Sequence, residues 1–299
     1  MMHKNNLIFI GGPTAVGKTS IAIKLAKHFS TEIVSCDSRQ FYKEMKIGTA
    51  IPSNHMLNEI KHHFIQDRSV LDHLSVGQYE KEALSILDIL FKKNKNIIMV
   101  GGSGLYASSV LYGLDSFPNV SIKTKNLINK LYEVNGLNYI KNLLKKRDIE
   151  YYEKVDLNNH RRIIRALEIC FETKLSYSSF LLNKQKKRNF EINIFIIDKK
   201  REILYDKIDQ RVDQMINNGL ENEAKSLIEF KDLNALQTVG YKEWFSYWNG
   251  QSSEKKVIDD IKRNTRRYAK RQLTWFKKYE KAKWIYEKDP INEILKYYR

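Results

Sequence analysis

The sequence predicts an α/β protein that has a parallel sheet in its core, an inserted helical domain and a helical C-terminal part. Short apolar runs alternate with stretches of helical spacing, and this alternation favours a parallel sheet. Between Val120 and Arg188 the spacing is helical throughout, without a strand pattern. At 299 residues the chain exceeds the usual size of a single core, so a second module is expected.

The predicted elements begin with a strand, a loop and a helix. Leu7 to Gly11 is a short apolar run that ends in glycines, and Lys18 to Phe29 has helical spacing, so together they form half of a βαβ unit. The longest helix is expected at Ser253 to Lys281. Further strands are expected at Glu32 to Ser35, His63 to Gln66, Asn96 to Val100, Ile192 to Ile197 and Lys283 to Tyr286.

These elements divide the chain into three segments. Residues 1–117 form the first part of the α/β core, residues 118–190 form the helical insertion, and residues 191–299 complete the core with a basic C-terminal helix. The insertion therefore interrupts the core and does not follow it.

The charge balance favours a polyanionic partner. The chain has 52 Lys and Arg against 35 Asp and Glu, a formal charge of +17, which is more than solubility requires. Nucleic acid is the natural partner, although AT-rich coding would also enrich Lys together with Asn, Ile and Tyr. The charge by itself leaves both explanations open.

Cysteine content and hydropathy indicate a cytoplasmic protein. Cys36 and Cys170 are the two cysteines, too few for a disulfide framework or a zinc-ligand pattern, so a reducing compartment is expected. Met1 to Asn6 leads into an apolar strand without a signal-peptide hydrophobic region, and no later run reaches the length that spans a bilayer.

A phosphate-binding loop follows the first strand. The pattern GxxxxGK[ST] lies between a strand and a helix, the context that defines a P-loop. Its backbone N–H groups and the helix N-terminus can bind phosphate oxygens, Lys18 balances their charge, and the Thr19 hydroxyl can hold Mg²⁺. The loop implies a diphosphate or triphosphate ligand, of a nucleotide or of another compound. Its residues are Gly12, Pro13, Thr14, Ala15, Val16, Gly17, Lys18 and Thr19.

An acidic residue follows the second strand. Asp37 is expected at the carboxyl edge of the sheet, near the P-loop, where α/β proteins bind their ligands. Its carboxylate could coordinate Mg²⁺ through water, accept a proton from a nucleophile, or cap the next turn. The neighbours Ser38, Arg39 and Gln40 offer hydrogen-bonding groups suited to base edges and phosphates.

A second acid, Asp198, ends an apolar strand as the magnesium-binding Asp of many P-loop enzymes does. We discount it, because it lies downstream of the insertion and is followed by basic residues, Lys199 to Arg201, that begin a helix. The central strand that ends at Val100 leads into Gly101-Gly102-Ser103-Gly104 without a carboxylate. Glycines there suit a close approach by a ligand or another chain segment.

Four segments, in this order, resemble the tRNA dimethylallyltransferase family. The ordered set is far more specific than any one of them. The family usually has Thr where this chain has Ser103, and its eukaryotic members add a zinc finger that this sequence lacks, which indicates the bacterial type. The segments are Gly12 to Thr19, Asp37 to Tyr42 with Ile47 to Ala50, Val100 to Tyr106, and Thr265 to Phe276.

The resemblance implies a P-loop NTPase-like core and a prenyl transfer to tRNA. Family members move the dimethylallyl group from dimethylallyl diphosphate to N6 of the adenine 3′ of the anticodon, position 37, in tRNAs that read codons beginning with U, and release diphosphate. The diphosphate would enter a channel at one end and the flipped adenine at the other. The implied partner is the anticodon stem-loop, the cofactor is Mg²⁺, and a monomer is expected.

The resemblance also implies roles for individual residues. Asp37 would accept the amine proton, while Lys18, Thr19, Mg²⁺ and Arg211 would stabilise the leaving diphosphate. Ser103 would contact the target nucleotide. His160-Arg161-Arg162 stands where the family commonly has Pro-Gln-Arg, so the match at Arg161 departs from the pattern. The expected tRNA-binding residues are Asp37, Ser38, Arg39, Gln40, Ser103, Arg161, Arg162, Ile163, Ile164 and Arg165.

The last long helix carries basic and aromatic residues. At helical spacing Arg263, Arg267, Lys270 and Lys277 share one stripe, which would follow a phosphate backbone or form a solvated face. Trp275 and Phe276 are expected to pack in the core. Two rival functions remain: a small-molecule or nucleoside kinase, which would consume ATP, and a basic RNA-binding protein without catalysis.

Overall fold

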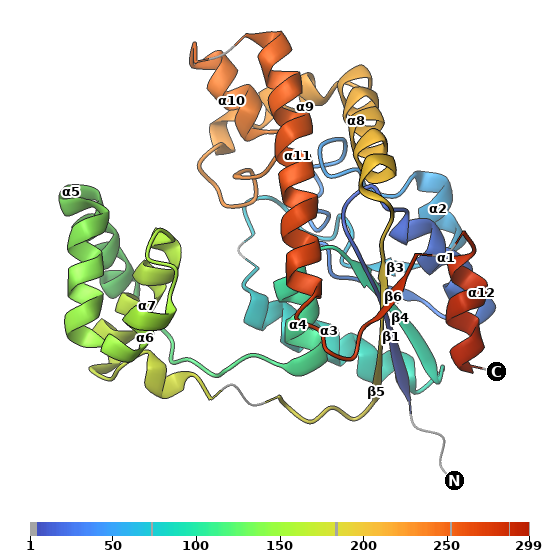
Figure 1. The fold of residues 1–299 in the computed structure, drawn as a ribbon, viewed down its shortest axis with the longest axis horizontal. Coiled ribbons are helices and arrows are strands. Elements are labelled where there is room, and N and C mark those ends of the chain that lie inside the picture. Colours follow the sequence, from blue (N-terminus) through green and yellow to red (C-terminus); the bar gives the residue numbers. More distant parts are fainter. Residues whose placement is uncertain (1–4, 73, 183–184, 252, 287, 299) are drawn as a thin grey trace. The chain divides into compact units, whose positions relative to one another are not determined.

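A computed structural model describes residues 5–72, 74–182, 185–251, 253–286 and 288–298. Residues 1–4 lie outside the described residues. They belong to the segment Met1 to Asn6, for which the sequence predicts no signal peptide. The chain forms two compact units, one of residues 1–112 with 187–299 and one of residues 113–186 (Figure 1). The sequence placed the corresponding boundaries at residues 118 and 190. We call the larger part the core unit and the smaller part the helical unit.

The core unit contains a six-stranded parallel sheet in the order β3-β2-β4-β1-β5-β6. The central strand β1 pairs with β4 and β5, so that Ile8 lies opposite Ile98 and Asn193. This arrangement confirms the predicted fold class. The strands are β1 (Asn6–Gly11), β2 (Ile33–Ser35), β3 (His62–His63), β4 (Asn96–Gly101), β5 (Glu191–Ile197) and β6 (Lys283–Ile285).

One face of the sheet is covered by α3 (Val76–Phe91), α4 (Gly104–Tyr112) and the end of α11 (Glu254–Phe276). Phe9 and Met99 point to this face, because successive side chains of a strand alternate between its two sides. Figure 1 shows α3 and α4 on this side of the sheet.

The other face is covered by α1 (Lys18–His28), α8 (Arg201–Asn217) and α12 (Pro290–Leu295). Ile8 and Ile10, which alternate with Phe9 along β1, are fully buried against these helices. Burial on both faces explains why the central strands are continuous apolar runs in the sequence.

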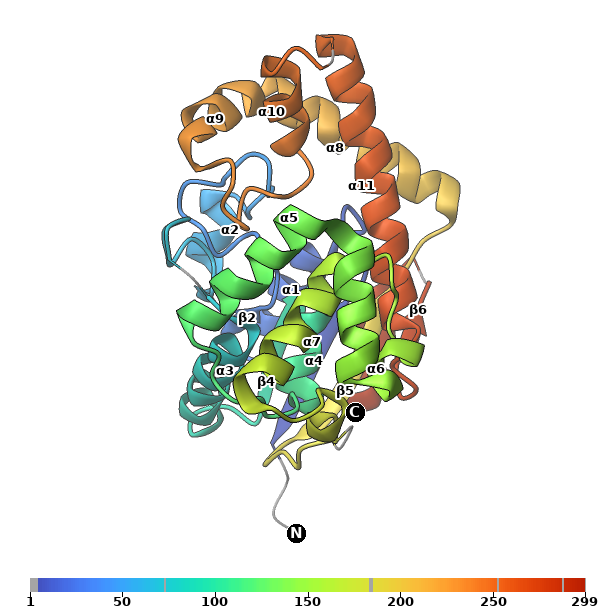
Figure 2. The ribbon, with the colours of Figure 1, turned by 90° about the vertical axis from the view of Figure 1, so that its left-hand side faces the viewer.

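A further apolar cluster lies where α8 and α11 extend beyond the sheet. There α9 (Leu220–Ser226) and α10 (Lys242–Trp248) pack with the far parts of the two long helices around the buried Trp244. Figure 2 shows these helices together at one end of the core unit. Tyr42 and Met45, from the segment after β2, belong to the same cluster. The loop after β2 is therefore anchored to the C-terminal helices.

The helical unit contains α5 (Ile122–Arg147), α6 (Ile149–Lys154), α7 (His160–Thr173) and the short η1 (Ser178–Phe180). Gly136 interrupts α5 with φ 75°, which lets one long helical sequence fold as two segments around α7. The described residues of this unit include no strand, in agreement with the sequence pattern.

Two predicted elements differ in length. The strand expected at His63 to Gln66 is reduced to β3, because Phe64 and Gln66 have φ angles of 60° and 51°, which no strand can accommodate. The long C-terminal helix ends at Phe276 and not at Lys281. Among the described residues between β3 and α3 there is no helix or strand, whereas α2 (Asn54–Glu59) precedes β3.

Cys36 and Cys170 are both buried and unpaired. Within the described parts of the chain, every helix is too short or too polar to cross a bilayer.

Candidate active site

The P-loop lies between β1 and α1 with the backbone geometry of an anion cradle. Gly12, Ala15 and Gly17 have φ angles of 147°, 64° and 101°, and α1 begins at Lys18. Positive and negative φ angles that alternate turn successive N–H groups inward. The Lys18 Nζ donates to Pro13 O at 2.8 Å. The loop thus presents N–H groups and one ammonium to the same space.

Asp37 is placed by the end of β2. Cys36 N donates to Val100 O at 2.8 Å, which carries the ladder one residue beyond the strand. A Cβ on Gly101 would lie 2.5 Å from Cys36 Sγ and 2.9 Å from Asp37 N. Glycine therefore lets β4 approach this backbone closely, as the sequence predicted for a neighbouring chain segment.

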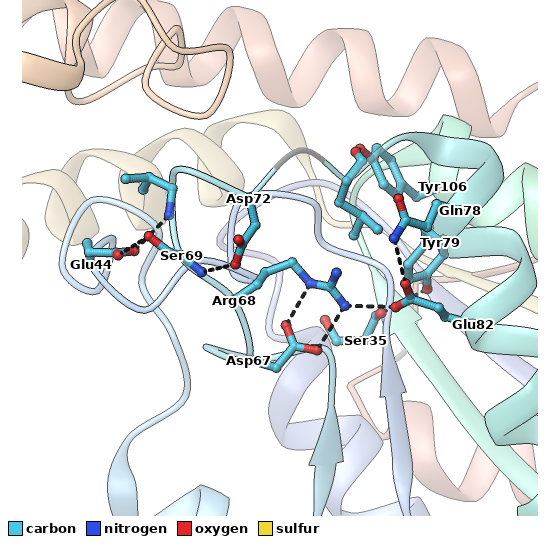
Figure 3. A network of polar contacts seen from close by, with 12 residues as sticks. Ser35, Glu44, Asp67, Arg68, Ser69, Asp72, Gln78, Tyr79, Glu82 and Tyr106 are labelled. Atoms are coloured by element: carbon cyan, nitrogen blue, oxygen red, sulfur yellow. Dashed lines mark hydrogen bonds and ion pairs between the residues drawn. The ribbon is translucent and has the colours of Figure 1, made fainter. Parts of the chain in front are cut away.

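A polar network fixes the surroundings of β2 (Figure 3). The Tyr79 hydroxyl donates to Ser35 O at 2.8 Å, and Arg68 binds Glu82 at 2.8 Å. Lys43 N donates to Arg68 O at 2.9 Å, so the segment after Gln40 is tied to the start of α3 through Arg68. The last residues of β2, which lead into Asp37, are thereby held between α3 and β4.

A polar cavity joins the P-loop to Asp37. Its lining includes Thr14, Lys18, Thr19, Asp37 and Arg211. Burial lowers the pKa of Lys18 from its ordinary 10.5 to about 8; nearby Asp37 opposes this shift and Arg211 adds to it. Burial also lowers the pKa of Arg211, again opposed by Asp37. Two cations are thus held in one desolvated pocket beside one carboxylate, which suits a ligand with more negative charge.

We expect the affinity for an organic diphosphate to fall as pH rises through about 8. The Lys18 amine binds phosphate in its protonated form, and a lowered pKa means that it loses the proton near pH 8 and not near 10.5. Calorimetric titration from pH 6.5 to 9.5 measures the decline. In Lys18→Met the decline should disappear; a decline of the same size in that variant would assign the titration to another group.

We call the polar cavity between the P-loop and Asp37 the phosphate cavity. It continues into a second, largely apolar cavity, which we call the apolar cavity. Thr14, Asp37 and Arg211 line both cavities. The rest of the wall of the apolar cavity comes from the segment after β2 and from α8, α11 and the segment before α10. The apolar side chains of this wall include Ile208, Val212, Met215, Val239 and Ile261. One carboxylate and one guanidinium therefore stand at the junction between a phosphate site and an apolar wall.

A third cavity, of about 370 Å³, continues from the second, with which it shares Arg39 and Tyr268. Ser38 N donates to Ser103 Oγ at 3.0 Å, and the two hydroxyl oxygens lie 3.1 Å apart. Burial, together with nearby Asp37, raises the pKa of Tyr268, which also hydrogen-bonds Ser103. Hydroxyl groups and the Trp275 ring line this wider space.

Arg39 and Gln40 are engaged by the protein's own backbone. Arg39 Nη1 donates to Asn234 O at 2.6 Å and to Ala235 O at 3.0 Å. Gln40 Nε2 donates to Thr49 O and Ala50 O at 3.2 and 3.1 Å. Both were expected to contact tRNA; in this structure they hold the loops that line the cavities.

Glu223 is a supporting residue that the sequence reasoning missed. Its carboxylate accepts hydrogen bonds from Lys46 N, Ile47 N and Gly48 N at 2.9, 2.8 and 2.9 Å. The Tyr241 hydroxyl adds a bond of 2.7 Å. Glu223 therefore fixes the loop whose next carbonyls bind Gln40 and, at Thr49 O, Arg211 at 3.5 Å.

Glu223→Gln is expected to destabilise the fold by about 1–3 kcal/mol. The backbone N–H groups lose a charged acceptor, and the NH₂ group of the new glutamine faces these donors. Urea unfolding measures the loss. The partly buried Glu221 lies on the same helix, and Glu221→Gln serves as the matched control. Equal stability of the two variants would contradict this role for Glu223.

The expected tRNA-binding residues of α7 belong to the helical unit. Arg161 and Arg162 are exposed, Ile164 is half-buried, and Arg165 binds Glu168 at 3.1 Å. The Ile163 side chain is fully buried in the core of this unit. The Ile163 side chain thus packs under the helix, and binding of tRNA by the stretch Arg161 to Arg165 stays a prediction.

The basic stripe of α11 is exposed along its length: Arg263, Arg267, Lys270 and Lys277 all face solvent. Phe276 is fully buried, as expected. Trp275 is partly buried, packs against the same core cluster and donates to Ser108 Oγ at 3.2 Å.

Asp198 lines a separate cavity, together with Lys270 and Trp284, whose described lining contains no P-loop residue. This placement agrees with the decision to discount Asp198 as the metal-binding acid of the P-loop.

Comparison with known proteins identifies the family. A family model described as IPP transferase matches residues 40–279. The chain therefore belongs to the IPP transferase family. It is 50% identical over 297 residues to the tRNA dimethylallyltransferase of Flavobacterium johnsoniae, which covers 97% of this chain and 96% of the relative. With tRNA dimethylallyltransferase 1 of Bacteroides fragilis it shares 42% identity over 99% of this chain and 98% of the relative.

Solved structures give the same result. The full-length tRNA isopentenylpyrophosphate transferase of Bacillus halodurans has a TM-score of 0.72 at 33% identity, covering 99% of this chain and 96% of its own. A eukaryotic dimethylallyltransferase acting on tRNA has a TM-score of 0.76 at 28% identity, covering 91% of this chain and 70% of its own. These likenesses confirm the family and the P-loop-type fold predicted from the sequence.

Proposed function

We propose that this protein is a tRNA dimethylallyltransferase that prenylates N6 of the adenine 3′ of the anticodon, position 37, in tRNAs that read codons beginning with U. The observation that carries the proposal is the series of three adjoining cavities. They lead from a phosphate cradle, past Asp37 and an apolar wall, to a wider space lined by hydroxyl and aromatic groups. The three cavities, taken in this order, suit the diphosphate, the prenyl group and the adenine base.

The P-loop would hold the diphosphate that leaves. Lys18 and Arg211 are desolvated cations in the cavity that Thr19 also lines, so they bind the negative charge that grows on the leaving group. An allylic carbon ionises readily once its diphosphate is neutralised, so stabilisation of this charge is the main contribution of the site.

Asp37 would act on the nucleophile. The adenine N6 forms a bond to the allylic C1 while the C1–O bond to diphosphate breaks, and the N6 proton passes to the Asp37 carboxylate. Asp37 lies at the junction of the phosphate cavity and the apolar cavity, where these two events must coincide. Ser103, which is hydrogen-bonded to Ser38, offers a hydroxyl in the third cavity, where the base would bind.

Mg²⁺ fits the donors of the phosphate cavity. Magnesium sites in such enzymes use one or two protein oxygens, with the substrate's phosphates and water as further ligands. The Thr19 hydroxyl lines the phosphate cavity and can serve in this way. The described residues contain no cluster of three or more His, Cys, Asp or Glu side chains that could hold the ion alone. Bound Mg²⁺ supplies charge neutralisation of the diphosphate.

Exposed basic residues in each of the two units support binding of an anticodon stem-loop. The stripe of α11 and the exposed Arg161 and Arg162 of α7 provide phosphate contacts that carry no sequence information. Extrusion of the base costs a few kcal/mol, roughly, and such contacts can offset it. We also propose a cytoplasmic monomer, since buried free thiols suit a reducing compartment and a charge of +17 opposes self-association.

One incubation tests the proposal against the kinase alternative. The purified protein is mixed with Mg²⁺, an unmodified tRNA that has adenines at the third anticodon position and its 3′ neighbour, and either dimethylallyl diphosphate or ATP. Nucleosides are then analysed by mass spectrometry. Prenylated adenosine formed only with dimethylallyl diphosphate is the expected result. Phosphate transfer from ATP with unchanged tRNA would overturn the proposal.

A further inference from the structure

Gln272 of α11 lies against the P-loop. Its side chain is buried, with 5% of its surface exposed. The Oε1 atom accepts a hydrogen bond from Thr14 N at 2.8 Å, and the Nε2 atom donates to Gly102 O at 2.9 Å. One amide therefore joins the phosphate-binding loop to the turn after β4.

The orientation of this amide is fixed. Rotation by 180° would place an NH₂ group against Thr14 N–H and an oxygen against Gly102 O, which replaces two hydrogen bonds with two repulsive contacts. Glycine at position 102 permits this close approach, because a Cβ there would overlap Nε2. The Thr14 N–H thus always faces the Gln272 oxygen.

This contact removes one donor from the phosphate cradle. The N–H groups of a P-loop are its main phosphate ligands. The Thr14 N–H is occupied, and the partial negative charge of the Gln272 oxygen lies beside it. Thr14 borders both the phosphate cavity and the apolar cavity, whereas Gln272 borders the wide cavity beyond. Of the P-loop residues that line the phosphate cavity, Lys18 and Thr19 form the open part of the cradle, whereas Thr14 is closed because its N–H is occupied.

We infer that Gln272 restricts the P-loop to diphosphate ligands and excludes a third phosphate. A diphosphate anchored at Lys18 and Thr19 fills the open part of the cradle. A further phosphate that extends the ligand along the loop reaches Thr14, where it meets an amide oxygen in place of a free N–H group. The inference rests on the proposed function and adds a reason why this P-loop selects a prenyl diphosphate over nucleoside triphosphates.

Calorimetric titration of the full chain tests the inference, with inorganic diphosphate and inorganic triphosphate as probes in the presence of Mg²⁺. The wild type should bind diphosphate about tenfold more tightly than triphosphate. Gln272→Met frees the Thr14 N–H, so the preference should shrink to near unity through tighter triphosphate binding. Gln272→Glu keeps an oxygen on Thr14 N but loses the hydrogen bond to Gly102 O, where its second oxygen now lies. It should retain the preference, although both anions bind more weakly. The exposed Gln210→Met is the control for the chemical change.

The outcomes separate the inference from the proposed function. Diphosphate binding without preference in the wild type, or an unchanged preference in Gln272→Met, overturns the inference alone. Loss of the preference in Gln272→Glu also overturns it, because the occupied Thr14 N–H would then not be the cause. Failure of the wild type to bind diphosphate at all overturns the phosphate assignment of the P-loop, and with it both proposals.

Discussion

Asp37→Ala is expected to lower kcat for tRNA prenylation by about 10²–10⁴-fold while tRNA affinity stays largely intact. The carboxylate lies at the junction of the phosphate and apolar cavities, where the N6 proton must leave as the new C–N bond forms. Asp37 N is held by Ser35 Oγ at 3.3 Å, a contact of the backbone that the substitution leaves in place. Single-turnover kinetics and equilibrium tRNA binding separate the two effects.

Two further variants show whether proton transfer causes the loss of activity. Asp37→Asn keeps the shape of the side chain and removes its basicity, so it should lose as much activity as Asp37→Ala if proton transfer is the cause. Asp206, exposed on α8, provides the control Asp206→Ala. If turnover of the Asp37 variants stays near that of the control, the role as general base is wrong.

Lys18→Met should lower kcat by about 10²–10³-fold and also weaken the binding of dimethylallyl diphosphate. The ammonium is held in a desolvated pocket, where its attraction for the charge that develops on the leaving diphosphate is stronger than it would be in water. Met has a similar length and no charge. Because the charge grows during ionisation, the loss should be larger in kcat than in ground-state binding.

Steady-state kinetics with dimethylallyl diphosphate as the varied substrate measure this effect. Lys24 lies on the same helix and is exposed, so Lys24→Met controls for the removal of one positive charge. A loss confined to KM would mean that Lys18 binds substrate and transition state equally well, which would contradict its assignment to the leaving group.

Local sequence patterns predicted most of the fold and the phosphate site. The P-loop and Asp37 each lie directly after a strand, so the parallel sheet itself brings them to one edge. The strand pattern failed after His63, because the left-handed backbone of Phe64 and Gln66 has no signature in residues that rarely adopt it. The burial of Ile163 could be inferred from the apolar face of α7, but the resemblance to the family directed attention to its arginine neighbours.

The supporting residues of the site could not be predicted in this way. Glu223 binds backbone groups 175 to 177 residues away in sequence, and Gln272 binds Thr14 across 258 residues. No periodicity or motif spacing encodes such contacts. For the same reason the hydrogen bonds of Arg39 and Gln40 to backbone carbonyls could not be predicted, since these carbonyls lie on loops whose positions only the tertiary fold defines.

The order of synthesis gives the Gln272 contact a consequence for biogenesis. A ribosome that has made the P-loop must add 258 further residues before its partner on α11 exists, a delay of roughly 10–50 s at ordinary translation rates. Until then β5 lacks its neighbour β6, and the Thr14 N–H lacks its Gln272 partner. A nascent chain thus carries an unfinished phosphate loop beside an open sheet edge, open to stray nucleotides and to strand pairing with other chains. Synthesis of α11 occupies the Thr14 N–H, and synthesis of β6 shortly afterwards closes the sheet edge.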